Sequence, residues 1–143
     1  DLHSFPTRRS SDLWQTLASF IEPFGKADIE VSVFIEPERQ AIDLAKQAGA
    51  GIVELHTGCY SRKKNTGAQE TELERIRLAA RHARSLGLAV VAGHGLNYRN
   101  VAPFRDIEEI EEISIGHAII ARAAFTGLES AVGEMLSLIG RKS

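Results

Sequence analysis

Four short apolar segments alternate with segments of helical periodicity, and this alternation constrains the fold more than any other feature of the chain. The apolar segments are rich in β-branched residues and cover residues 30–35, 51–57, 88–93 and 113–118. Amphipathic helical patterns follow them over residues 36–48, 70–86, 101–112 and 119–139, the last with a break at 126–127. Strands separated by helices predict a parallel sheet with helices outside it, so the expected fold class is α/β.

Local signals place the ends of these elements. Residues 14–21 repeat apolar side chains at helical spacing, and Pro23 and Gly25 are expected to end that first helix. Glu36 and Pro37 are expected to open the next helix, because proline is tolerated at the first helical position and a carboxylate favours the positive end of the helix dipole. The strand between these helices has the pattern of one buried on both faces.

Composition excludes several classes of protein. The chain has 143 residues, 43% of them hydrophobic and 25% charged, with a formal net charge of −2. It is too apolar and too weakly charged to be disordered, and its balanced charges do not indicate nucleic-acid binding. No membrane span is expected, since the apolar stretches are far shorter than the roughly 20 residues that a span needs. Cys59 is the only cysteine, which excludes an intrachain disulfide and indicates a reducing compartment such as the cytoplasm.

The first 12 residues differ from the rest of the chain. They have no apolar period, they include Pro6 and a Ser/Arg cluster, and they lack the apolar region of a signal peptide. They resemble translated sequencing-adapter sequence, so residues 1–12 are interpreted as non-native, with an ordinary disordered tail as the alternative. Residues 13–143 are expected to hold the folded part of the chain.

Ionisable side chains collect at the carboxyl ends of three predicted strands, where parallel α/β proteins place their chemistry. Period-two alternation predicts three sets of residues that share a face: 52, 54 and 56, then 90, 92 and 94, then 113, 115 and 117. If these faces all point inward, Glu54, His56, His94 and His117 lie together. A carboxylate beside imidazoles at a partly dry edge suits proton transfer.

Glycines beside these histidines indicate anion binding. Gly93 and Gly95 flank His94, and Gly116 precedes His117 just before a predicted helix. Backbone N–H groups at a helix N-terminus attract phosphate, and glycine lets the phosphate approach closely. A tight strand-to-helix turn is the structural alternative for Gly116 and His117.

The polar residues also have structural interpretations. Glu54 on an apolar strand needs a reason, because an unpaired buried carboxylate is unfavourable; proton transfer and a structural ion pair both supply one. His56 fits a hydrogen-bonded structural histidine as well as a functional one. The histidines lie on three strands without the spacing of a zinc motif, so no metal is expected.

The segment 58–67 is predicted to be a polar loop. Cys59 has no base at motif spacing there and is not expected to be a nucleophile. Arg62, Lys63 and Lys64 are interpreted as a solvated part of this loop, or as a mobile lid that attracts an anionic substrate.

Four blocks of the sequence resemble the pyridoxine 5′-phosphate synthase family. They are VSVFIEP (31–37), GIVELHTGCY (51–60), VVAGHGLNYRNV (90–101) and ISIGHAIIARAAFTGLESAVGEM (113–135). The resemblance implies a TIM (β/α)8 barrel, of which this chain holds the C-terminal half, strands 5–8 with their helices. It also implies condensation of 3-amino-2-oxopropyl phosphate with 1-deoxy-D-xylulose 5-phosphate to pyridoxine 5′-phosphate, phosphate and water, with no metal or organic cofactor.

The same resemblance implies a role for each matching residue. His94 matches the family's catalytic proton donor, and Glu54 matches the carboxylate that stabilises the transition state. Gly95 matches a substrate-binding glycine. Gly116 and His117 match the pair that binds the amino-ketone phosphate, so small phosphorylated molecules are the expected partners.

The family's first four strands have no counterpart in this chain. In the family they carry an Asn and an Arg for the substrates, a His/Arg/His group and a catalytic Glu, so the chain alone is expected to be inactive. The family forms homo-oligomers, and a half-barrel with an open apolar face is expected to self-associate. Two alternatives remain: a phosphate-binding half-barrel without catalysis, and another phosphate-handling barrel enzyme such as an isomerase or epimerase.

Overall fold

A four-stranded parallel sheet forms the centre of the computed structural model, which describes residues 10–140. Its strands are β1 (Ser32–Ile35), β2 (Ile52–His56), β3 (Ala89–Gly93) and β4 (Glu112–Ser114). They pair in chain order, each parallel to the next, because every connection between them is a crossover over one face of the sheet. The predicted α/β class with a parallel sheet is confirmed.

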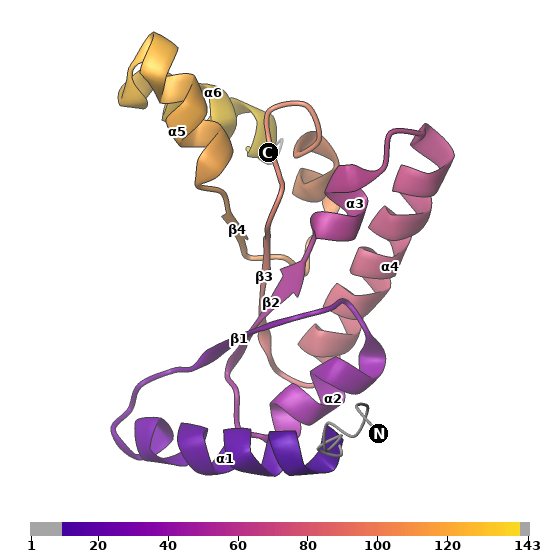
Figure 1. Ribbon diagram of the computed structural model, residues 1–143, viewed down its shortest axis with the longest axis vertical. Helices are drawn as coiled ribbons and strands as arrows, with labels where there is room; N and C mark the ends of the chain where they lie inside the picture. Colours follow the sequence, from indigo (N-terminus) through magenta and orange to yellow (C-terminus); the bar gives the residue numbers. More distant parts are fainter. Residues whose placement is uncertain (1–9, 141–143) are drawn as a thin grey trace, which may run out of the picture.

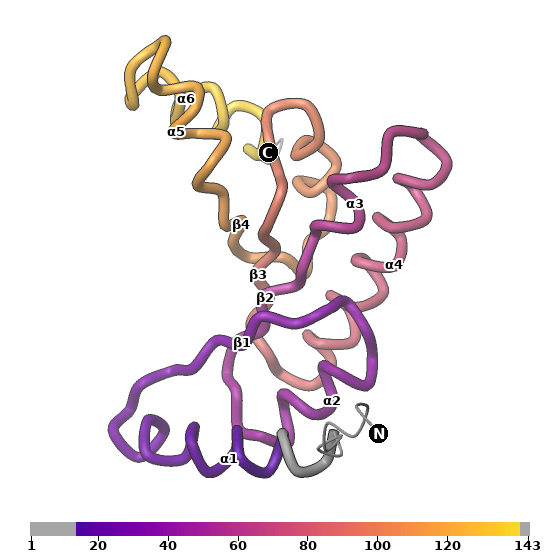
Figure 2. Tube along the Cα trace, in the orientation of Figure 1, coloured from indigo at the N-terminus to yellow at the C-terminus, as the bar shows by residue number. Residues whose placement is uncertain are grey.

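Helices fill the connections and flank the sheet. They are α1 (Ser10–Lys26), α2 (Arg39–Gln47), α3 (Gly58–Arg62), α4 (Thr66–Ser85), the 3-10 helix η1 (Ala102–Asp106), α5 (His117–Thr126) and α6 (Leu128–Ile139). Helix α2 packs against β1, and α4 packs against β2 and β3, so both cover the same side of the sheet (Figure 1). Figure 2 shows α1 and the α5–α6 pair at opposite ends of the molecule, with the sheet between them.

Several predicted helix ends are wrong, and the helical stretch predicted over residues 101–112 is only the short 3-10 helix η1. Helix α1 continues through Pro23 to Lys26, because a proline in the last turn removes only one hydrogen bond from the helix. Helix α2 begins at Arg39 and not at Glu36, which lies between β1 and the helix. Helix α1 also includes residues 10–12 of the segment predicted to be non-native, and the remainder of that segment lies outside the described residues.

The segment predicted to be a polar loop is partly helical. It contains α3, and α4 begins at Thr66, four residues before the predicted start at Glu70. Asn65 caps α4: its Oδ1 accepts a hydrogen bond from the backbone N–H of Ala68 at 3.0 Å. The sequence analysis missed this start because Asn65 lies in a run of polar residues, before the apolar residues that mark the helical period.

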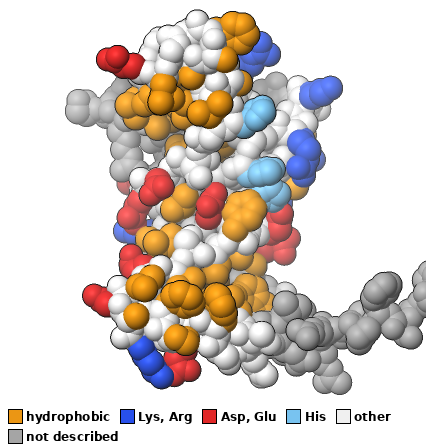
Figure 3. All heavy atoms as spheres, turned by 60° about the vertical axis from the view of Figure 1, so that its left-hand side comes forward, with side chains coloured by type: hydrophobic (Ala, Val, Ile, Leu, Met, Phe, Trp, Pro, Cys, Tyr) orange, Lys and Arg blue, Asp and Glu red, His pale blue; other side chains and the backbone are white. Residues whose placement is uncertain are grey.

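The two faces of the sheet have different environments. Val53, Leu55, Val90 and Ala92 are fully buried on the side covered by the helices. On the other side Phe34 is 55% exposed, so the prediction that β1 is buried on both faces is wrong. Figure 3 views the molecule from the side of this open face and shows hydrophobic side chains at both ends of it, with carboxylate and histidine side chains between them.

Over residues 10–140, no helix combines the length and the hydropathy needed to cross a bilayer.

Candidate functional site

The carboxyl ends of β2, β3 and β4 border one pocket with a volume of about 680 Å³. All five residues that the sequence predicts for the site line it: Glu54, His94, Gly95, Gly116 and His117. The lining is completed by Phe34, Leu96, Asn97, Ser114, Ile115 and Ala118. The parallel sheet therefore brings candidate residues from three separate segments of the chain into one cavity.

His94 reaches this pocket by a route that period-two alternation does not predict. In the sheet Glu54 pairs with Val91 and Leu55 pairs with Ala92, so residues 90 and 92 lie on the helix-covered face and not on the face of Glu54. The predicted grouping of residue 94 with residues 90 and 92 is therefore wrong. His94 has a φ of 82°, and this left-handed conformation ends the strand and turns the side chain to the open face.

The sequence predicted that His117 lies on the fourth strand, and this prediction is wrong. Strand β4 ends at Ser114, and His117 is the first residue of α5, with Gly116 at the N-cap. A Cβ added to Gly116 would meet no atom within 4 Å, so the space in front of this helix start is open. The first N–H groups of a helix have no intrahelical acceptor, and an anion is favoured there.

Hydrogen bonds from the end of β2 hold the left-handed turn at His94. The buried Oγ1 of Thr57 lies 2.8 Å from the carbonyl oxygen of Gly93 and 2.6 Å from that of His94, so the single hydroxyl hydrogen is shared between these two acceptors. Ser61 Oγ lies 3.3 Å from the same His94 carbonyl oxygen. Sequence reasoning missed Thr57; its signal was its position directly after His56, at the end of a predicted strand.

Glycines provide the space that the functional side chains occupy. A Cβ at Gly93 would collide with Glu54 Oε1, so the Glu54 carboxylate lies directly over the backbone beside His94. Gly95 has a φ of 79°, and a Cβ there would lie 2.8 Å from Ser61 Oγ. Larger residues at these two positions are incompatible with the observed site.

His56 lies beside the pocket, in contact with His94. The ring centroids of the two histidines are 4.8 Å apart, with an angle of 64° between the ring planes. His56 Nδ1 lies 2.5 Å from Glu36 Oε1. Sequence reasoning missed Glu36 as a site residue, although its position directly after the first strand places it at the same edge of the sheet.

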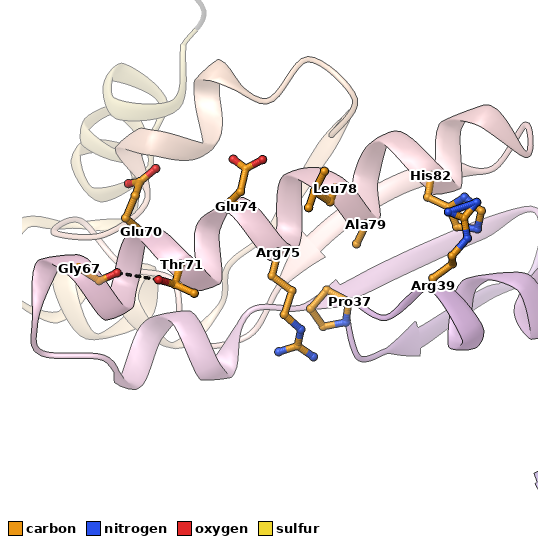
Figure 4. A pocket seen from close by; sticks show the side chains of 10 residues that line it. All are labelled: Pro37, Arg39, Gly67, Glu70, Thr71, Glu74, Arg75, Leu78, Ala79 and His82. Carbon is orange, nitrogen blue, oxygen red and sulfur yellow. Dashed lines mark hydrogen bonds between the residues drawn. The ribbon is translucent and has the colours of Figure 1, made fainter.

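A second groove lies on the outer side of the molecule, between α2 and α4. It has a volume of about 940 Å³, and Figure 4 shows Arg75 extending from α4 toward Pro37 at its wall. Burial lowers the pKa of Arg75, but the hydrogen bond to Glu72 and the charges of Glu72, Glu38 and Glu36 outweigh burial and raise that pKa. Arg75 therefore stays positively charged, and it lies next to Glu36.

Tyr60 joins α3 to the loop after β3. Its buried hydroxyl donates to the carbonyl oxygen of Asn100 at 2.7 Å, and its ring packs edge-on against Phe104 at 5.2 Å. Burial raises the pKa of Tyr60, the charge of Glu70 raises it further, and Arg77 opposes both. A neutral, hydrogen-bonded Tyr60 keeps this wall of the site fixed.

The loop residues considered from the sequence lie elsewhere. Cys59 and Arg62 belong to α3, where Arg62 lies 3.5 Å from Cys59 Sγ. In the described part of the chain, neither these two nor Lys63 and Lys64 line the pocket, and a lid function for Arg62, Lys63 and Lys64 stays a prediction. No cluster of three or more His, Cys, Asp or Glu side chains suited to a metal ion occurs among residues 10–140.

Fold and site together define a parallel α/β protein with a carboxylate, imidazoles and a helix N-terminus at the carboxyl edge of its sheet. Parallel α/β folds bind and transform small ligands at this edge. A family model described as "Pyridoxal phosphate biosynthesis protein PdxJ" matches residues 10–141. The chain belongs to this family, since the match covers most of its length.

Curated relatives agree with the family. The chain is 70% identical over 126 residues to the pyridoxine 5′-phosphate synthase of Pelodictyon phaeoclathratiforme, covering 88% of this chain and 53% of that protein. It is 63% identical over 123 residues to the synthase of Chlorobium phaeobacteroides, and 50% identical over 123 residues to that of Chloroherpeton thalassium. Each of these two matches covers 86% of this chain and 52% of the relative, so the chain spans about half the length of the curated relatives it matches.

Proposed function

We propose that this chain supplies the C-terminal half of a TIM-barrel pyridoxine 5′-phosphate synthase, strands 5–8 with their helices, formed by residues 13–143. The four parallel strands in chain order and the open face of the sheet support this proposal. A complete (β/α)8 barrel takes about 250 residues. Four further strands would cover the open face and close the sheet.

The proposed reaction condenses 3-amino-2-oxopropyl phosphate with 1-deoxy-D-xylulose 5-phosphate to pyridoxine 5′-phosphate, phosphate and water, without a metal or organic cofactor. The convergence of the five candidate residues in one pocket carries this proposal. His94 donates a proton, and Glu54 stabilises charge that develops in the transition state. Gly95 contacts substrate, while Gly116 and His117 bind the amino-ketone phosphate at the start of α5.

A chimaeric enzyme tests this function. In it, the matched region of the Pelodictyon phaeoclathratiforme synthase is replaced by the corresponding residues of this chain, and release of phosphate from the two substrates is measured. We expect activity from the chimaera, and losses of about 10²- to 10⁴-fold in kcat for His94→Asn and for Glu54→Gln, the range typical of acid–base groups. An inactive but folded chimaera would overturn the proposal, as would full activity in both variants.

Phosphate binding without catalysis is the second candidate, favoured by the fact that the chain spans about half the length of its relatives. Calorimetric titration of the intact chain with inorganic phosphate separates the two candidates. Binding to the chain together with an inactive chimaera would support a non-catalytic phosphate-binding protein. Absence of phosphate binding to both proteins would overturn this second candidate.

A further inference from the structure

We propose that Glu36 and His56 form a positioning pair, which holds the His94 imidazole in the orientation needed for proton transfer. The inference rests on the proposed function of His94 and adds two residues that act through it. Glu36 follows β1, His56 ends β2 and His94 follows β3, so three neighbouring strands supply one side chain each. The pair is thus built into the register of the parallel sheet.

The first contact of the pair fixes the His56 ring. Its Nδ1 lies 2.5 Å from Glu36 Oε1, and a carboxylate at that distance selects the tautomer with hydrogen on Nδ1 and sets the direction of the ring plane. A Cβ at Gly58 would collide with the opposite nitrogen, Nε2, so the backbone at Gly58 closes the far side of the ring. The His56 side chain is 19% exposed and has little room to turn.

The second contact, between the two histidine rings, orients the imidazole of His94. The rings meet edge to face at a centroid distance of 4.8 Å, and Phe34 lies 5.1 Å from His56 and 6.3 Å from His94. Edge-to-face contacts between rings at this distance are directional. Among the described residues, His56 and Phe34 are the two rings that contact the imidazole of His94.

Glu36 is itself held from the other side. Its Oε2 lies 3.6 Å from an Arg75 guanidinium nitrogen, and the same nitrogen lies 3.2 Å from Glu38 Oε1. One carboxylate therefore has its two oxygens directed to two different cations or hydrogen-bond donors, His56 and Arg75. The short contact to His56 and the longer ion pair to Arg75 together restrict rotation of this half-exposed carboxylate.

The chain offers a matched control for this pair. His82 Nε2 lies 2.6 Å from Asp43 Oδ1, and the exposed fractions of the two side chains, 12% and 42%, resemble the 19% and 46% of His56 and Glu36. This second pair joins α4 to α2 beside the outer groove (Figure 4, which labels His82). It has the same chemistry as the proposed pair and does not line the pocket of His94.

Kinetics of the chimaeric enzyme give the first test. We expect Glu36→Gln and His56→Leu to lower kcat about tenfold to 10²-fold, as a small misplacement of a reacting group does, and to change KM by less than about threefold. Glu36→Asp keeps the charge and is expected to retain more of kcat than Glu36→Gln. Asp43→Asn is expected to leave kcat within about twofold of the parent. Equal kcat values for Glu36→Gln and Asp43→Asn would overturn the proposal.

Histidine ring signals in NMR spectra of the intact chain give the second test, and this test needs no activity. We expect Glu36→Gln to move the ring signals of both His56 and His94, and Asp43→Asn to move those of His82 only. His94 signals that stay unchanged in Glu36→Gln would overturn the proposal. If the parent chimaera is inactive, the proposed function fails, and the spectra alone decide whether the pair orients His94.

Discussion

His94 carries backbone strain at the centre of the candidate site. A residue other than glycine in the left-handed region costs about 1–3 kcal/mol, and such strain persists only where surrounding contacts enforce it. Here the Thr57 hydroxyl and Ser61 Oγ hold the His94 carbonyl oxygen. The gain is the direction of the side chain, since only this conformation brings the imidazole to the face of Glu54.

Gly93→Ala tests the space on which Glu54 depends. The added methyl group would collide with the Glu54 carboxylate, which is the end of a flexible side chain and moves away, and it would lie 3.0 Å from Ser114 Cβ. We expect the chimaeric enzyme to lose activity by about tenfold or more, because a displaced carboxylate no longer meets the transition state. Phosphate release and thermal unfolding are measured together.

Gly133→Ala is the matched control for this substitution. Gly133 lies inside α6, where an added Cβ meets nothing within 4 Å, and alanine favours the helix by about 1 kcal/mol over glycine. We expect unchanged activity and a small gain in stability. If Gly93→Ala also left activity unchanged, the closeness of Glu54 to Gly93 would be irrelevant to function.

At the scale of elements, the site depends on how the end of β2 is joined to the end of β3. The backbone N–H of Thr57 donates to the carbonyl oxygen of Gly93 at 2.8 Å, and its hydroxyl shares one hydrogen between the carbonyl oxygens of Gly93 and His94. Thr57 is fully buried, and the hydrogen bond from its hydroxyl to the Gly93 carbonyl oxygen is buried as well. These bonds join the two strands at the point where the pocket begins.

Thr57→Val tests this junction by removing the hydroxyl at nearly constant volume. We expect the free energy of unfolding to fall by about 1–3 kcal/mol, because the buried carbonyl group of Gly93 and the part-buried one of His94 lose a hydrogen-bond partner. Urea unfolding of the intact chain measures the change. Thr71→Val on α4 is the control: its hydroxyl donates to the Gly67 carbonyl oxygen at 3.0 Å in an exposed position, and a change within about 0.5 kcal/mol is expected. A similar loss of unfolding free energy in both variants would show that the Thr57 hydroxyl stabilises the fold no more than an exposed hydroxyl does.

Prediction of the elements succeeded where the periodicity was long and failed at their ends. The four strands and the long helix α4 have clear apolar periods, and the structure contains all of them. Helix α3 was missed because its five residues are too few to show a helical period. Glu36 was assigned to a helix start because it precedes Pro37 and suits the positive end of a helix dipole. Its pairing with His56 is a contact between neighbouring strand ends, which local sequence signals do not report.

At the scale of the whole molecule, large hydrophobic side chains remain exposed on the pair of helices that follows β4. The exposed fractions are 65% for Ile120, 89% for Phe125, 58% for Leu128 and 57% for Leu136. Together with Phe34 on the open sheet face, they leave large apolar side chains exposed over two parts of the molecule, as is typical of surfaces that contact other protein. Other parts of a barrel, or another copy of the chain, would bury it.

Sedimentation velocity of the isolated chain tests whether this surface drives self-association. We expect dimers or larger species at micromolar concentration, as for other proteins with exposed apolar surface and open sheet edges. Phe125→Ser is expected to weaken the association. Leu78→Ser, at a residue 57% exposed on α4 in the outer groove, is the control and is expected to have little effect. A monomer at all concentrations would contradict the prediction.

The sequence by itself determined the order of strands and helices and the residues available at the carboxyl ends of the strands, because hydrophobic periodicity and residue identity are local properties. It did not determine that His94 faces Glu54, since period two holds only for regular strand backbone and the left-handed turn is enforced by Thr57, 37 residues away. It also did not determine that Glu36 meets His56. That contact joins residues 20 positions apart, and only the register of the parallel sheet brings them together.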